Sequence, residues 1–233
     1  MADFAFTKIK PRSIENEIIS RLRAAIVSGQ FPPGTHLNES EIAKQMEVSR
    51  IPIREAIKKL EQEGLVVRLP NKGVDVISFT EQDVRETFSL RARLESMAFE
   101  WAIPNITNED MAQLRALVKE QETAIAERRY DDLARLDMLF HELICLKAGH
   151  SRLLKIWYEL HAQGQMLLNL RFRQMADYTP KTVTEDHLKI LDAIERGDID
   201  SAVRLTNTIS ERVIDECIET LVDLTASEEA VSQ

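Results

Sequence analysis

The stretch that decides the fold of the N-terminal part is NESEIAKQMEVSRIPIREAIKKLEQEGL, residues 38–65. Asn38 and the acidic residues after it have the layout of a helix cap, and they predict a brief helix that ends near Met46. Ser49 is then expected to cap a second helix, which Gly64 ends. Because a three-residue turn joins these two helices, the stretch predicts a helix-turn-helix.

The flanking residues complete a predicted domain. Apolar residues recur at helical spacing over residues 14–26, which predicts a first amphipathic helix. Beyond the helix-turn-helix the period changes, and short β-branched or leucine-rich runs at 65–69 and 74–77 flank the turn composition Pro-Asn-Lys-Gly at 70–73. This pattern predicts a β-hairpin. We therefore expect residues 1–78 to form a winged helix-turn-helix.

The remainder of the chain, residues 79–233, is expected to be all-helical. Its helical patterns are separated by short polar breaks. The long ones are too apolar on one face to stand alone, so they should pack as a bundle. The pattern predicts six helices, or seven if one is broken, before a polar tail that follows Thr225. The six expected ranges are roughly 81–103, 108–129, 131–148, 151–175, 180–196 and 199–224. The sequence thus predicts a mainly α protein with two domains.

Composition restricts the compartment. The chain of 233 residues is 44% hydrophobic and has no apolar run near the ~20 residues that span a bilayer. Its N-terminus lacks the basic-then-apolar layout of a signal peptide, so we expect a cytoplasmic protein without a membrane segment. Cys145 and Cys217 lie in apolar helical patterns with no metal-binding spacing nearby. They are expected to be buried and reduced.

The net charge of −9 is unevenly distributed. Residues 1–78 hold 12 basic and 10 acidic residues, whereas the rest of the chain holds 18 and 29. This asymmetry is typical of a basic binding module joined to an acidic domain that phosphate would repel.

Two arginines mark the beginning of the second helix of the helix-turn-helix. Arg50 and Arg54 are four residues apart, so they lie on one helix face, at the end that enters the major groove in such motifs. Arginine suits guanine O6 and N7, and Ser49 with the free backbone amides can hold a phosphate. The alternative is that the two arginines only solvate an exposed face. The surrounding helix-turn-helix and wing favour the DNA-binding interpretation.

Three ungapped segments carry a family resemblance: Pro33–Ala43, Val48–Ile57 and Leu60–Val66. Together they resemble the signature of the GntR family of regulators. The resemblance implies that Ser49, Arg50, Pro52 and Arg54 contact DNA, and that the wing glycine, Gly73, lets the hairpin tip approach the minor groove. Ser40 departs from the fatty-acid-responsive relatives, which carry a phosphate-contacting arginine there.

The C-terminal part resembles the FCD sensor domain of the FadR subfamily. The residues that carry this resemblance are Leu90–Glu95, Asp137–His141 and Asp186–Ile194. Other branches of the GntR family differ in their C-terminal domain. A branch with a fused aminotransferase would need hundreds more residues, and a branch with a mixed α/β sensor would need strands after residue 80, so neither fits this sequence. The resemblance implies a transcriptional repressor or activator, a homodimer on an inverted-repeat operator, and a small-molecule effector such as an organic acid.

Asp137 and His141 are four residues apart and can share one metal ion from a single helix face. In metal-binding FCD domains the matching residues are joined by a histidine matching His187 and by a second histidine in the last helix. Carried over without gaps, that last position is Ile209. The resemblance therefore implies three ligands for an ion such as Zn²⁺, Ni²⁺ or Mn²⁺, with a position left for water or an effector carboxylate.

Other interpretations of these residues stay open. The cluster could hydrogen-bond an effector directly, with Arg91 gripping its carboxylate, although Arg91 could equally pair with Glu95 at i,i+4. The C-terminal domain could merely dimerise without sensing, or the cluster could belong to a metal-dependent hydrolase. His36, His150 and His161 are expected to be cap or surface residues.

Overall fold

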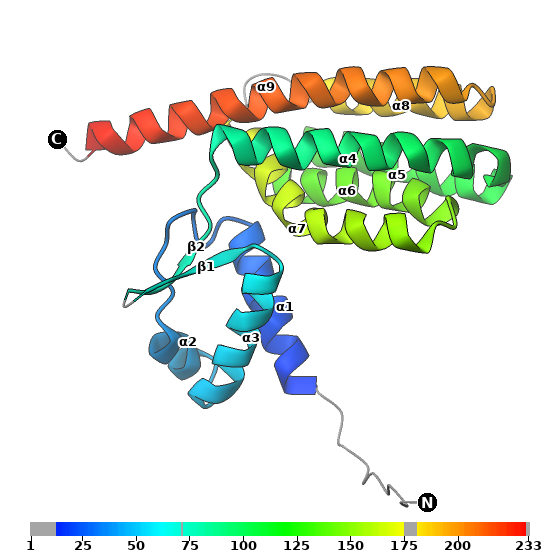
Figure 1. Cartoon of the computed structure of the whole chain (residues 1–233). Coiled ribbons are helices and arrows are strands. Elements are labelled where there is room, and N and C mark those ends of the chain that lie inside the picture. The colour runs from blue at the N-terminus through cyan, green and yellow to red at the C-terminus, as the bar shows by residue number, and fades with distance from the viewer. Residues whose placement is uncertain (1–12, 71, 175–180, 232–233) are drawn as a thin grey trace, which may run out of the picture.

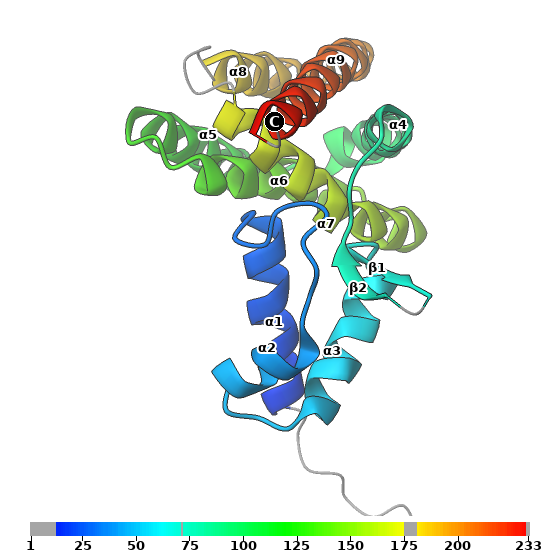
Figure 2. The same cartoon turned by 90° about the vertical axis from the view of Figure 1, so that its left-hand side faces the viewer.

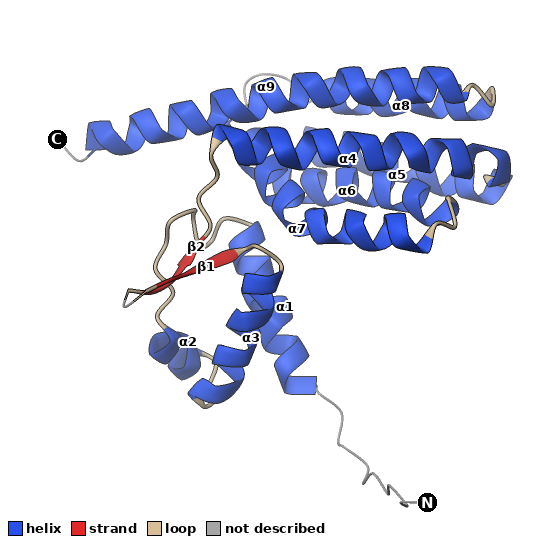
Figure 3. Ribbon diagram, in the orientation of Figure 1, coloured by secondary structure: helices blue, strands red, loops and turns tan. Residues whose placement is uncertain are grey.

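The computed structural model describes residues 13–70, 72–174 and 181–231, and its N-terminal unit joins three helices to a two-stranded sheet (Figure 1, Figure 3). The elements of this unit are α1 (Ser13–Val27), α2 (Glu39–Gln45), α3 (Arg50–Gln62), β1 (Val66–Leu69) and β2 (Gly73–Val76). The strands pair antiparallel, with Val66 opposite Val76. The predicted winged helix-turn-helix is confirmed, although Asn71 of the predicted wing turn lies outside the described residues.

Local chemistry accounts for these elements. The Asn38 side chain accepts hydrogen bonds from the backbone amides of Ser40 and Glu41, so it caps α2 as expected. Ser49 occupies the N-cap position of α3, but its side chain makes no capping hydrogen bond. The apolar stripe of α3 is fully buried and forms the centre of the N-terminal core; its members are Ile53, Ala56, Ile57 and Leu60.

The C-terminal unit is a bundle in which α4 and α9 pack side by side (Figure 1). Its elements are α4 (Glu81–Ala102), the short 3₁₀ helix η1 (Ile103–Asn105), α5 (Asn108–Ala126), α6 (Tyr130–Lys147), α7 (Ser151–Gln174), α8 (Lys181–Glu195) and α9 (Ile199–Val231). Thr80 and Thr107 form capping boxes with Asp83 and Asp110, which fixes where α4 and α5 begin. The all-helical prediction for this half is confirmed.

One predicted boundary is wrong. The sequence pattern ended the last helix near residue 224 and assigned a polar tail after Thr225, whereas α9 continues to Val231. The added residues contain no glycine or proline and are rich in alanine and glutamate. Because such residues propagate a helix without an apolar face, periodicity alone missed them.

Helix α7 connects the two units. Met166 of α7 is buried in the N-terminal core rather than in the bundle core. The buried Asn169 side chain donates a hydrogen bond of 2.6 Å to the carbonyl of Val27, at the end of α1. Gln163 donates one of 2.9 Å to the carbonyl of Gly64, after α3. The orientation of the N-terminal unit therefore depends on α7.

Both cysteines behave as expected, since Cys145 and Cys217 are free and buried. Burial raises the pKa of the Cys217 thiol to about 12, so it is a thiol rather than a thiolate at neutral pH. Across the described ranges, the structure contains no helix whose length and apolar character would let it cross a membrane.

Candidate functional site

The first candidate site is the N-terminal turn of α3, which lies at the end of the N-terminal unit away from the bundle (Figure 2). The side chains of Arg50 and Arg54 are 58% and 52% exposed. Glu39, from α2, links them: its Oε2 atom lies 3.6 Å from Arg50 Nη2 and 3.3 Å from Arg54 Nε. Sequence reasoning missed Glu39, because a contact between two helices leaves no spacing signal within either one.

The structure also places the other three residues expected to contact DNA. Ser49 is exposed, and its hydroxyl is not used by the helix. Pro52 lies in the first turn of α3, where a missing N–H costs no helical hydrogen bond. Gly73 has a φ of +95°, and a Cβ there would lie 2.6 Å from Cε1 of His36, whose Nδ1 atom is 2.7 Å from Asp75. The wing itself therefore requires a glycine, independently of any approach to DNA.

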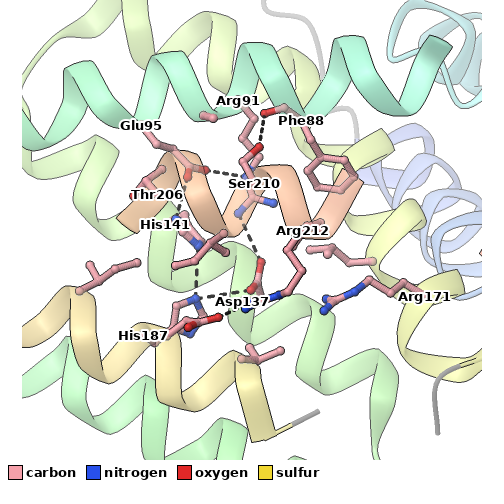
Figure 4. A pocket seen from close by; sticks show the side chains of 17 residues that line it. Phe88, Arg91, Glu95, Asp137, His141, Arg171, His187, Thr206, Ser210 and Arg212 are labelled. Atoms are coloured by element: carbon pink, nitrogen blue, oxygen red, sulfur yellow. Dashed lines mark hydrogen bonds and ion pairs between the residues drawn. The ribbon is translucent and has the colours of Figure 1, made fainter. Parts of the chain in front are cut away.

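The second candidate site is a cluster inside the bundle. Asp137 and His141 of α6 meet His187 of α8, and one potential ligand atom from each lies within 4.8 Å of the others (Figure 4). The Nε2 atoms of the two histidines are 3.3 Å apart, and His187 Nε2 is 3.5 Å from Asp137 Oδ1. All three residues are buried. The structure thus brings together the three residues that the sequence grouped.

Two acceptors orient the imidazole rings from behind. Gln121 of α5 places its Oε1 atom 2.8 Å from His187 Nδ1. Glu95 of α4 places Oε2 at 2.9 Å from His141 Nδ1, although the alignment falls short of a good hydrogen bond. The acceptor at His187 Nδ1 holds the proton of that ring there, which leaves the Nε2 lone pair of His187 pointing at His141. A lone pair aimed at a second ring nitrogen suits either a cation or a shared proton between the two rings.

The electrostatics of the cluster agree with this assignment. Burial lowers the pKa of His187 to about 3, so its ring is neutral at physiological pH. Burial alone would raise the pKa of Asp137, but Arg91 and the two histidines lower it overall. The same balance, with Arg91 and His141 as partners, lowers the pKa of Glu95. The site therefore offers one carboxylate and one neutral imidazole as ready ligands.

The donor spacing fits a small divalent ion. Two imidazole nitrogens at ~2.05 Å from a tetrahedral ion are about 3.3 Å apart, which matches the observed separation of the two Nε2 atoms. The two carboxylate oxygens of Asp137 have different partners: Oδ1 faces His187, and Oδ2 accepts a hydrogen bond of 3.3 Å from Arg91. Three protein ligands of this kind leave a fourth position open.

A cavity of about 50 Å³ adjoins the cluster. Three arginines line it, and all are paired with acids: Arg91 with Glu95 and Asp137, Arg171 with Glu216, and Arg212 with Asp186. Ile209 of α9 also lines this cavity, on the wall contributed by the last helix.

The remaining sequence expectations have mixed outcomes. The i,i+4 pair of Arg91 and Glu95 is formed, at 2.5 Å, within the cavity wall. His150 is a cap residue, since its Nδ1 accepts from the Leu153 amide, and His36 is exposed. The expectation for His161 is wrong: it is half-buried against Trp157, and burial lowers its pKa.

Comparisons with known proteins match both units to known families. Residues 14–76 match the family model described as bacterial regulatory proteins, gntR family, and residues 86–212 match the FCD domain. The gluconate operon transcriptional repressor of Bacillus licheniformis is 32% identical over 78% of this chain and 76% of its own length. The HTH-type transcriptional repressor RspR of Escherichia coli is 30% identical over 85% of this chain and 86% of its own.

Solved structures agree on the fold. A GntR protein from Rhodococcus sp. RHA1 superposes with a TM-score of 0.77 at 22% identity, over 89% of this chain and 98% of that one. McbR/YncC of E. coli has a TM-score of 0.74 at 19% identity, over 92% of this chain and 100% of that one.

Proposed function

Because the chain belongs to the GntR family of bacterial regulatory proteins and carries an FCD domain, we propose that residues 1–78 bind an operator and that residues 79–233 form an effector-binding and dimerisation domain. The matched families and relatives are transcriptional regulators rather than enzymes, which leaves no role for a hydrolase. The observation that carries the proposal is the exposed pair Arg50 and Arg54 at the start of the recognition helix.

We assign the DNA contacts to the residues around this pair. Arg50 and Arg54 contact base edges or adjacent phosphates in the major groove. Ser49, whose hydroxyl is free, contacts a phosphate at the helix N-terminus. Pro52 lies within the same turn, and Gly73 keeps the wing tip narrow where it approaches the minor groove.

The experiment begins with selection of an operator from a random library by the full-length protein. Arg54→Ala is expected to weaken binding to this operator by about 1–3 kcal/mol at fixed salt. Arg196→Ala removes an equally exposed arginine, on the bundle, and serves as the matched control. Unchanged affinity in Arg50→Ala and Arg54→Ala would contradict the groove assignment.

The dimer face is proposed to be α4. Leu90, Met97 and Trp101 are spaced by seven and four residues, so they share one face of this helix, and all three are exposed. Such a stripe is costly in water, and a second copy of the chain would cover it. Two-fold symmetry of the dimer would then require an inverted-repeat operator.

For the sensor we propose that Asp137, His141 and His187 hold one divalent ion, with Zn²⁺, Ni²⁺ and Mn²⁺ as candidates. When bound, the ion would supply a Lewis-acid site for an effector oxygen. Ile209 lies where the last helix lines the cavity and cannot coordinate, which supports a three-ligand site with an open position. Arg91, which is paired with Glu95 and Asp137, would hold Asp137 in place, and an oxygen of a small organic acid would complete the coordination shell of the ion.

The sensor proposal is tested by thermal unfolding of the full chain with and without a chelator. A small organic acid such as acetate is expected to stabilise the metal-loaded protein, and the shift is expected to shrink after chelation, because ion and acid complete the same coordination shell. If the acid shifts the melting temperature of neither the metal-loaded nor the chelated protein, a C-terminal domain that dimerises without sensing is favoured.

A further inference from the structure

Ile51 is the most exposed large hydrophobic side chain among the described residues, at 74%. It is the second residue of α3, between Arg50 and Pro52. Isoleucine is a weaker helix former than alanine, and this side chain contributes nothing to the core. Neither helix stability nor packing accounts for an isoleucine at this position.

The geometry of α3 places Ile51 on the outermost ridge of the helix. At about 100° per residue, its side chain points almost directly away from the stripe that contains Ile53 and Leu60, both fully buried. Arg54, three residues later, lies beside it on the same exposed side. Glu39 contacts the guanidinium groups of Arg50 and Arg54, whereas the side chain of Ile51 remains exposed beside them.

On the major-groove edges of the four base pairs, the 5-methyl group of thymine is the one apolar feature. An isoleucine offers no hydrogen bond and no charge, so it can favour that methyl group but cannot select guanine or adenine. Resting on the proposed DNA-binding function, we infer that Ile51 contacts the 5-methyl group of a thymine in each operator half-site and thereby determines specificity at that base pair.

The inference has a quantitative consequence that separates Ile51 from the arginines. Removing one methyl group from a buried contact costs ~0.8 kcal/mol, which is about fourfold in affinity per half-site. Because the contact is apolar, replacing Ile51 leaves the salt dependence of binding unchanged, whereas replacing a phosphate-contacting arginine reduces it.

The experiment uses the full-length protein and its selected operator. Each thymine of the half-site is replaced in turn by deoxyuridine, which lacks only the 5-methyl group, symmetrically in both half-sites. Affinities are measured at fixed salt for the parent protein, for Ile51→Ala and for Arg54→Ala. We expect one thymine whose replacement weakens DNA binding by the parent about fourfold per half-site. The same replacement should not weaken binding by Ile51→Ala further, but it should still weaken binding by Arg54→Ala.

Two outcomes would overturn the inference alone. In the first, deoxyuridine lowers the affinity of the parent and of Ile51→Ala by the same factor at every position. In the second, the selected half-site has no thymine opposite the start of α3. In both cases the arginine assignments would stand. If no operator is selected at all, or if Arg54→Ala binds like the parent, the proposed function itself fails. Equal melting temperatures of Ile51→Ala and the parent confirm that the variant is folded.

Discussion

Replacing Gln121 with leucine is expected to weaken metal binding at the Asp137, His141 and His187 cluster without unfolding the bundle. Gln121 is fully buried, and its Oε1 atom lies 2.8 Å from His187 Nδ1. Leucine has a similar volume but no acceptor. The ring proton of His187 is then no longer held at Nδ1, and the tautomer with a free Nε2 lone pair is no longer favoured.

The size of the effect follows from the loss of one orienting partner out of two. Outer partners of this kind are typically worth 10- to 100-fold in metal affinity, which is about 1.4–2.7 kcal/mol. The fold should tolerate the change. Gln121 Nε2 is buried and has no hydrogen-bond partner among the described residues. Removing this unpaired amide group stabilises the fold and offsets part of the free energy lost by leaving His187 Nδ1 unpaired.

The assay is competition for Zn²⁺ with a chromophoric chelator at fixed pH, combined with melting curves of the metal-free proteins. Gln113→Leu, an exposed substitution on the same helix, is the matched control and should bind metal like the parent. If Gln121→Leu and Gln113→Leu bound Zn²⁺ with equal affinity, the orienting role of Gln121 and the inferred tautomers would be refuted.

Three further predictions concern contacts between elements. Glu39→Gln should raise affinity for non-specific DNA, because it removes a negative charge beside Arg54, and should lower the ratio of specific to non-specific binding measured by fluorescence anisotropy. Asn169→Ala should preserve operator binding but reduce the difference in affinity between zinc-loaded and chelated protein, measured with the same probe. Met97→Glu should give the mass of one chain by light scattering, whereas Leu188→Glu, on α8, should leave the dimer intact.

The sequence was sufficient to predict the helices and strands, because the caps and apolar periods that indicate them lie within each element. Asn38 caps the helix that it was expected to begin, Thr80 and Thr107 cap the helices that follow them, and the stripe of α3 is buried as its period required. The end of α9 was missed for the same reason. Beyond Thr225 the helix has good helix formers but no apolar period.

The partners of the site residues could not be predicted, because they come from other helices. Glu39 contacts the arginines from α2, and Gln121 and Glu95 reach the histidines from α5 and α4. Nothing in the spacing of α6 indicates which polar residue of a neighbouring helix will face it. The grouping of Asp137 with His187 came from a family resemblance rather than from periodicity.

The size of the cavity indicates how a signal would reach the DNA-binding unit. A volume of about 50 Å³ has room for about four water-sized groups, so a small acid fits and a larger one must displace lining side chains. Two of these, Leu168 and Arg171, belong to α7. On the same helix Met166 is buried in the N-terminal core and Asn169 bonds Val27. Because a packed helix moves as a unit, a larger effector that displaces Arg171 from Glu216 would also shift the contacts that orient α1 and α3.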